Sequence, residues 1–166
     1  MLDLIVSRRS IRSFEPRPVG EGLVERILEA GRWAPSGMNN QPWRFAVITD
    51  RGLVEQVSRL TRYSRILAQA PVLVAVFLDM EASYHRTKDV QAIGACIQNM
   101  LLEAHAEGLG AVWIGEILRS EAELKELLEA PEGFELMAVL AVGHPRGPAP
   151  RPPARKALEE LVFFRK

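Results

Sequence analysis

The apolar residues of this chain recur with two different periods, one typical of helices and one typical of strands. Residues 21–33 have apolar side chains at helical spacing and glutamates in the first turns, where the helix dipole favours acidic groups. Asp50 is placed to cap a second helix, because the apolar positions after it also recur every three or four residues. Further helices are expected at residues 88–107 and 121–129, whereas residues 62–69 show no clear period.

Four apolar segments have the pattern of strands, at residues 43–49, 72–78, 111–114 and 135–142. The first alternates, so that Trp43, Phe45 and Val47 share one face. The second and fourth are continuously apolar, which is typical of strands covered on both faces. We therefore predict a sheet between helices, with Trp43, Phe45 and Phe77 in its core.

The C-terminal part of the chain differs from the rest. Five prolines between residues 145 and 153 exclude a helix there and predict an extended spacer. Beyond it, residues 158–164 are too apolar for a free tail and are expected to dock on another surface. We therefore expect one domain over residues 1–166, with a core at 1–144 and an extended C-terminal arm at 145–166.

Composition narrows the class of protein. The 21 basic and 21 acidic residues cancel, which removes a whole-chain electrostatic argument for a nucleic-acid or membrane partner. Cys96 is the only cysteine, so it forms no intramolecular disulfide and no CxxC site. Residues 1–6 lack the pattern of a signal peptide, and the longest apolar run, residues 72–78, is far shorter than the ~20 residues that span a bilayer. A cytoplasmic protein is therefore expected.

Three segments carry groups suited to a ligand. Residues 7–12 contain three arginines and two serines, and guanidinium groups with hydroxyls are donors that bind a phosphate. Residues 34–43 are rich in amides, which offer donors and acceptors to the edge of a heteroaromatic ring. Residues 108–115 stop at a glycine whose backbone can approach a ligand. Taken alone, the first segment also suits a solvated basic turn, and the second a capped loop.

Other chemistries find little support in the sequence. No GxGxxG follows the first strand, no GxxxxGK[ST] or GxSxG occurs, and His85, His105 and His144 lack the spacing of metal ligands. Cys96 lies among small residues inside the long helix, which indicates a core position rather than a nucleophile. Asp89 is interpreted as a residue that favours the dipole of the same helix. We therefore expect no metal site.

Four segments, in order along the chain, resemble the nitroreductase family of FMN-dependent oxidoreductases. They are RRSIRSF at residues 8–14, APSGMNNQPWRF at 34–45, QNMLLEAHAEGLGAVWIG at 98–115 and PARKALEELV at 153–162. The resemblance covers nearly the whole chain. It implies an α+β fold, a three-layer α-β-α sandwich with a central, mostly antiparallel sheet, and a homodimer that exchanges the C-terminal arm.

The resemblance also assigns FMN-binding residues. In the family, the first segment holds the phosphate and ribityl chain, and the second reaches the flavin from the other subunit. The loop after the short strand lies against the isoalloxazine with a backbone amide near N5, and a late arginine returns to the phosphate. The corresponding residues here are Arg8, Arg9, Ser10 and Arg12, then Pro35, Ser36, Gly37 and Asn39, then Trp113, Ile114, Gly115 and Glu116, and finally Arg155.

The activity implied by the resemblance is hydride transfer from NAD(P)H through FMN to a small electron-poor acceptor, such as a nitroaromatic, a quinone or a flavin, in a ping-pong sequence. The flavin N5 carries this chemistry, so no catalytic side chain is required. Two alternatives stay open. One is a specialised chemistry of the family, such as reductive dehalogenation or flavin fragmentation, and the other is a non-catalytic protein that binds a flavin or another anion.

Overall fold

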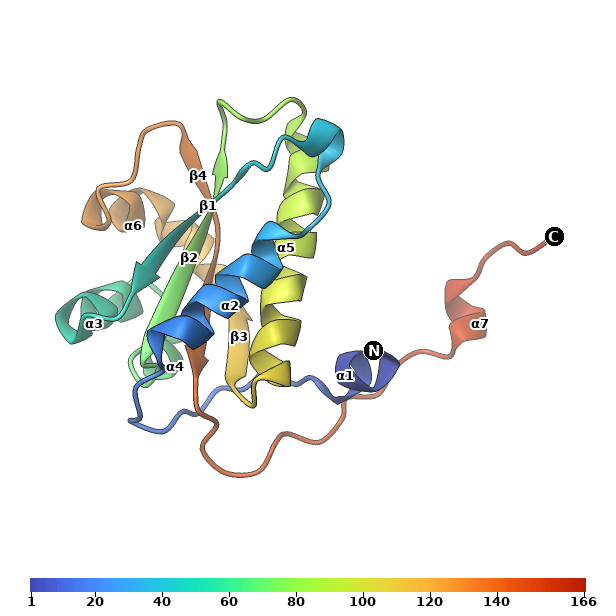
Figure 1. The fold of residues 1–166 in the computed structure, drawn as a ribbon, viewed down its shortest axis with the longest axis horizontal. Coiled ribbons are helices and arrows are strands. Elements are labelled where there is room, and N and C mark those ends of the chain that lie inside the picture. The colour runs from blue at the N-terminus through green and yellow to red at the C-terminus, as the bar shows by residue number, and fades with distance from the viewer.

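A computed structural model describes residues 1–166 and has a four-stranded antiparallel sheet at its centre (Figure 1). The strands are β1 (Trp43–Ile48), β2 (Val72–Asp79), β3 (Gly110–Ile114) and β4 (Phe134–Gly143), in the spatial order β1-β2-β4-β3. β2 pairs with β1 and β4, and β3 pairs with β4, each time antiparallel. The four expected strands are therefore confirmed, with boundaries that differ by at most one residue at each end.

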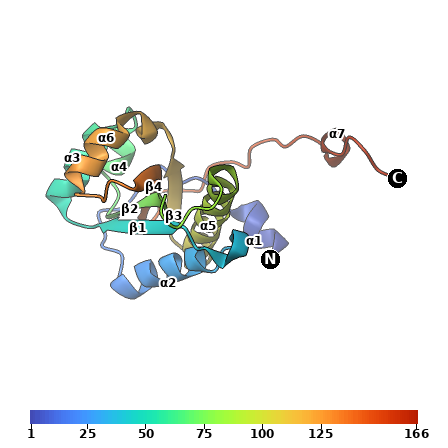
Figure 2. The same cartoon turned by 90° about the horizontal axis from the view of Figure 1, so that it is seen from above.

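Helices cover both faces of the sheet and produce the expected three layers (Figures 1 and 2). One face packs against α2 (Glu21–Arg32) and α5 (Arg86–Ala106), and the other packs against α3 (Arg51–Arg59), α4 (Ser64–Leu67) and α6 (Glu121–Leu127). Along β2, Val74 and Val76 belong to the first layer, whereas Leu73 and Ala75 belong to the second. Every residue of β2 is buried, as its continuous apolar run predicts.

The aromatic side chains Trp43, Phe45 and Phe77 all belong to the core, but they do not form one cluster. Trp43 is buried, and Phe45 partly buried, on the face covered by α2 and α5. Phe77 is buried on the opposite face, where its ring centroid lies 6.2 Å from that of Phe134. The register explains the separation, because Phe77 pairs with Arg44 and therefore shares the face of that residue.

Local signals explain which helices the sequence predicts. Asp50 caps α3 as expected, because its carboxylate accepts a hydrogen bond of 2.8 Å from the backbone N–H of Leu53. α5 and α6 lie where expected, within two residues, and α4 lies in the segment without a clear period. Four short elements were not expected: α1 (Leu2–Ser7), the 3-10 turns η1 (Gly37–Asn39) and η2 (Glu116–Ser120), and α7 (Leu158–Leu161). Such short turns are too brief to show a helical period.

Glycine allows α2 and α5 to pack closely. A Cβ atom on Gly31 of α2 would lie 2.7 Å from Cγ of Met100 and 3.1 Å from Sγ of Cys96, so no larger residue fits without displacement. Cys96 is fully buried at this contact, as the small-residue pattern of the helix predicts.

The N-terminal segment and the start of the C-terminal arm lie at the edge of the sheet where β3 begins and β4 ends. Ser10 forms a parallel bridge with Ala111, and Phe14 forms an antiparallel bridge with Pro145. From Arg146 onward the arm is exposed, and it extends away from the core (Figures 1 and 2). None of the helices is both long and apolar enough to cross a membrane.

Candidate functional site

Three arginines without carboxylate partners gather near the two ends of the chain. Arg8 is partly buried just after α1, and burial, followed by the nearby charges of Arg9 and Arg155, lowers the pKa of its guanidinium. This guanidinium still stays charged at physiological pH. None of the three belongs to an ion pair, so their like charges are not balanced within the chain. Such a cluster has the chemistry of a phosphate site.

The N-terminal segment also brings Arg12 to the loop that follows β3. The backbone N–H of Ile11 donates a hydrogen bond of 3.1 Å to the carbonyl oxygen of Ala111, next to the Ser10 bridge. A cavity of about 200 Å³ lies between Arg12, Tyr63 and residues 112–116. Ligand pockets typically measure roughly 300–1,000 Å³, so this cavity is only part of a binding site.

In this loop, the chain itself holds the side chain of Glu116. The carboxylate accepts hydrogen bonds from the hydroxyl of Thr61 at 2.6 Å and the backbone N–H of Arg62 at 3.3 Å, and it pairs with Arg119 at 3.2 Å. The Thr61 bond is the main cause that lowers the pKa of Glu116, while burial acts in the opposite direction and the two arginines add to the lowering. The loop can therefore offer its backbone, rather than this carboxylate, to a ligand.

The amide-rich loop between α2 and β1 has an unusual backbone. Met38, Asn39 and Gln41 have φ angles of 54°, 56° and 46°, which lie in the left-handed region that non-glycine residues rarely adopt. Ser36 supports this turn, since its hydroxyl accepts a hydrogen bond of 3.0 Å from the backbone N–H of Gln41. Strained backbone of this kind clusters at ligand-binding sites. Met38 and Asn39 are exposed, so both side chains are free to meet a ligand or a partner.

A buried carboxylate fixes this loop to the N-terminal end of α5. Asp89 accepts hydrogen bonds from the side-chain amide of Asn40 at 2.9 Å and the hydroxyl of Ser83 at 2.7 Å. It also accepts them from the backbone N–H groups of Tyr84 at 3.1 Å and His85 at 3.0 Å. Burial acts to raise the pKa of Asp89, but these hydrogen bonds together lower it. The interpretation of Asp89 as a helix-dipole residue is therefore incomplete, because it also joins two loops to α5.

Tyr84 packs directly over Gly37 in the same loop. A methyl group on Gly37 would overlap the hydroxyl oxygen of Tyr84, so only glycine permits this contact. The ammonium group of Lys88 lies 5.3 Å from the centroid of the Tyr84 ring, which is within the range of a cation–π interaction. An open groove beside Gly37 is lined by Pro35, Ser36 and the first turns of α5.

A single chain does not bring all the expected site residues together. The segment that carries Arg8 lies near the C-terminal end of α5, where the hydroxyl of Ser7 is 2.9 Å from Nε2 of His105. The amide-rich loop lies near the N-terminal end, at Asp89. At ~1.5 Å of rise per residue, these two points are about 24 Å apart along the helix. Pro35, Ser36, Gly37 and Asn39 are therefore too far from Arg8 to share one small ligand within one chain.

Sequence reasoning missed Asn40 and Tyr84 in this region and gave Asp89 only a role at the helix dipole. The motif pattern does not distinguish Asn39 from Asn40, although the first is exposed and the second turns inward. The Oδ1 atom of Asn40 is the one buried side-chain polar atom without a hydrogen-bond partner. Asp89 lies in a polar first turn, beside Thr87 and Lys88, so nothing local marks it as a buried anchor, and its partner Asn40 comes from elsewhere in the sequence.

Comparisons with known proteins identify the family of the chain. The family model described as "Nitroreductase family" matches residues 5–62 and 51–144. A protein of Archaeoglobus fulgidus assigned as an NADH dehydrogenase/NAD(P)H nitroreductase is 36% identical over 148 residues, which cover 87% of this chain and 85% of that protein. The iodotyrosine deiodinase of Thermotoga neapolitana is 30% identical over 191 residues, which cover 99% and 98%.

A solved structure of similar fold belongs to the same class of proteins. A protein of Desulfovibrio desulfuricans, assigned as a nitroreductase and solved in complex with FMN, superimposes with a TM-score of 0.93 at 46% identity. The match covers 99% of this chain and 96% of that one. The chain therefore belongs to the nitroreductase family.

Proposed function

We propose that the protein is an FMN-dependent oxidoreductase that transfers a hydride from NAD(P)H to a small electron-poor acceptor. Family membership and the FMN complex of a relative with 46% identity support an enzyme of this class. The observation that carries the proposal is the cluster of Arg8, Arg9 and Arg155, because three guanidinium groups without carboxylate partners suit the phosphate of FMN. Bound FMN supplies the hydride chemistry, so the chain positions the ring and needs no catalytic acid or base.

Each expected site residue has a proposed role. The three clustered arginines bind the phosphate, and Ser10 and Arg12 bind the ribityl chain. The backbone of residues 113–116 is assigned to the isoalloxazine. The side chain of Glu116 is already held by Thr61 and Arg119, so the backbone is what this loop offers to the ring. The residues that reach the flavin from a second chain are Pro35, Ser36, Gly37 and Asn39.

The proposed active form is a homodimer with FMN at the subunit interface. Two antiparallel α5 helices would bring the amide-rich loop of one chain to the arginine cluster of the other, which removes the separation of about 24 Å within one chain. Gly94 on α5 supports a close approach there, because nothing lies within 4 Å of a Cβ atom built on it.

The C-terminal arm supports the same assembly. Phe163 and Phe164 are 101% and 69% exposed, so these rings make little contact with their own chain. Large apolar side chains usually find a partner surface, and we propose that the arm crosses to the other subunit. The setting we propose is the cytoplasm, where a lone thiol such as Cys96 stays reduced.

Anaerobic addition of NADPH to the purified yellow protein tests the proposed activity. The visible absorbance of the bound flavin should bleach and should return when a quinone or a nitroaromatic is added. Initial rates with two substrates should give parallel double-reciprocal lines, because both substrates use one open flavin face. Intersecting lines under every condition would contradict this scheme, and a protein that never binds flavin would favour the non-catalytic alternative.

Reductive dehalogenation is the second candidate, because the deiodinase relative is 30% identical over 99% of this chain. The two candidates differ in the acceptor. The reduced protein should therefore be mixed with a nitroaromatic, a quinone, free flavin and an iodinated phenol, and the rate of flavin reoxidation measured for each. Fastest reoxidation by the iodinated phenol, with stoichiometric iodide release, would favour the dehalogenase.

A further inference from the structure

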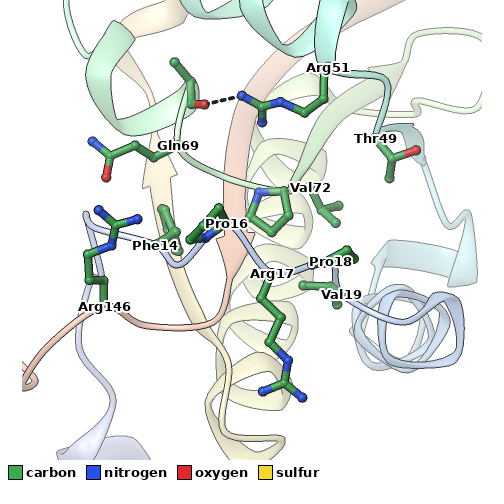
Figure 3. Close-up of a pocket in the computed structure, with 12 residues that line it drawn as sticks. Phe14, Pro16, Arg17, Pro18, Val19, Thr49, Arg51, Gln69, Val72 and Arg146 are labelled. Atoms are coloured by element: carbon green, nitrogen blue, oxygen red, sulfur yellow. Dashed lines mark hydrogen bonds between the residues drawn. The ribbon is translucent and has the colours of Figure 1, made fainter.

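A second cavity lies apart from the proposed flavin site, between the segment that follows the first arginine motif and the start of β2. Its volume is about 530 Å³, within the range of pockets that bind small molecules. The floor contains the buried ring of Phe14 together with Val72, and three prolines also line the cavity (Figure 3). Proline fixes its own backbone, so this apolar floor is formed before any ligand arrives.

The rim of this cavity is basic. Arg17, Arg51 and Arg146 line it, and no carboxylate lies among the lining residues. None of the three arginines belongs to an ion pair. In Figure 3 Arg146 lies at the left beside Phe14 and Gln69, Arg51 lies at the top, and Arg17 extends downward, away from both. Unpaired cations therefore border the apolar pocket at more than one point.

The two arginines differ in how they are held. The guanidinium of Arg51 donates to the carbonyl oxygens of Ala68 at 2.7 Å and Ala70 at 3.1 Å, which fixes its plane and leaves other N–H donors free. Arg146 is placed by its backbone, whose N–H donates to the carbonyl oxygen of Ser13 at 2.9 Å. Its side chain makes no hydrogen bond to the protein and can therefore follow a ligand.

We infer that this cavity binds a small organic carboxylate with a compact apolar body. Arg51 offers a fixed donor pair to the carboxylate and Arg146 a mobile one, while the apolar body contacts the prolines and Val19, above the buried ring of Phe14. The site goes beyond the proposed function, because it uses none of the residues assigned to the flavin.

The C-terminal arm is the alternative occupant. Residues 151–166 contain five basic residues and two acidic ones, so the arm as a whole is positive, and an excess of like charge at an arginine rim is unfavourable. Its apolar segment, residues 157–164, has only the two acidic residues, so removal of the arm is part of the test below. An anion, in contrast, balances the two guanidinium groups and fills the pocket.

Titration of the flavin-loaded protein with benzoate tests this inference, with methyl NMR signals of Val19 and Val72 as the readout, since both residues line the cavity. Benzoate should shift these signals saturably. Acetate, which lacks the apolar body, and benzyl alcohol, which lacks the charge, should bind at least about tenfold more weakly. Arg146→Gln should weaken benzoate binding at least about fivefold, whereas Arg59→Gln, an exposed arginine outside the cavity, should leave it unchanged.

Several outcomes would overturn the inference. The first is the absence of saturable shifts of the Val19 and Val72 signals. The second is equal binding of benzoate by Arg146→Gln and the unmodified protein, because benzoate would then bind elsewhere, such as over the flavin. A third is binding that appears only after removal of the residues beyond Gly147, which would show that the arm fills the cavity. None of these measurements uses NAD(P)H oxidation, so a failure here leaves the proposed oxidoreductase activity standing.

Discussion

The side-chain amide of Asn40 donates a hydrogen bond of 2.9 Å to the buried carboxylate of Asp89, and this contact joins the amide-rich loop to α5. The same amide donates to the carbonyl oxygen of Ala82 at 3.0 Å. We propose that this loop reaches the partner's flavin and that α5 lies at the interface. The loop therefore takes its position from the interface helix. A change at Asp89 should therefore affect flavin binding without touching the flavin.

Replacement Asp89→Asn should destabilise the protein by about 2–4 kcal/mol, because asparagine has one acceptor oxygen instead of two, so its NH2 group must face either the side-chain amide of Asn40 or the backbone N–H groups of Tyr84 and His85. Denaturant unfolding measures this change. The matched control is Glu25→Gln, at an exposed position of α2, which should change stability by less than about 0.5 kcal/mol.

Comparison of Asp89→Asn with the unmodified protein gives a pH dependence of stability with a defined sign. The pKa of Asp89 is lowered in the folded state, so its contribution is present above the unfolded pKa of about 3.9 and is lost as the pH falls through the folded pKa. The stability difference between the unmodified protein and Asp89→Asn should therefore be constant at neutral pH and shrink below about pH 4. A difference that grows toward acid would show that Asp89 is not an ionised anchor.

The sequence predicts the sheet well because each strand is identified by its own residues. The continuous apolar runs at β2 and β4 need cover on both faces, and the structure provides it. The segments that we propose for the flavin are likewise runs of adjacent residues, and their assignment to the flavin follows from the resemblance to the family. A pattern of this kind can be recognised from a few neighbouring residues, without knowledge of the rest of the fold.

Features that depend on distant partners were not predictable in the same way. Asp89 meets Asn40 across 49 positions of sequence, and no period within either segment records that contact. Phe77 lies on the face opposite to Trp43 because of the pairing register between β1 and β2. The separation of Arg8 from the amide-rich loop follows from the length of α5. It can be recognised only once both ends of the helix have been placed.

Replacement Gly37→Ala should weaken FMN binding and cost about 1–3 kcal/mol of stability, because the added methyl group overlaps the hydroxyl of Tyr84. Tyr84→Ala in the same chain should recover most of the loss, which a denaturation series on the single and double variants measures. Gly22→Ala is the control, since nothing lies within 4 Å of a Cβ atom there and alanine favours the helix. Equal losses with and without Tyr84 would mean that the overlap is not the cause.

Substitution of Arg8 or Arg155 by glutamine should weaken FMN binding about 10- to 100-fold, since each removes a charge-assisted hydrogen bond to the proposed phosphate position. Reconstitution of apoprotein, followed by quenching of flavin fluorescence, gives the affinity. Riboflavin, which has no phosphate, should bind the variants and the unmodified protein alike. Arg59→Gln removes an equal charge outside the cluster and should have little effect. A matching loss for riboflavin would indicate a general disturbance rather than a phosphate site.

Cys96 should resist thiol reagents in the native protein. Burial raises the pKa of this thiol to about 12, so almost no reactive thiolate exists at pH 8. A chromogenic disulfide reagent should therefore modify no thiol in the native state and one thiol per chain in denaturant. Rapid native modification would show that the contact between α2 and α5 opens readily.

Removal of the residues after Gly147 should convert the protein to a weaker dimer with less bound flavin. The truncated chain keeps the whole sheet and both helical layers, so the fold should persist. It loses Arg155, which lies near Arg8, and the exposed rings of Phe163 and Phe164 that we propose cover the partner. Sedimentation velocity gives the oligomeric state, and the visible absorbance gives the flavin content. The double replacement Phe163→Ser and Phe164→Ser in the full chain separates the two effects, because it should weaken the dimer while leaving Arg155 in place. A truncated protein that stays dimeric and fully yellow would contradict both roles of the arm.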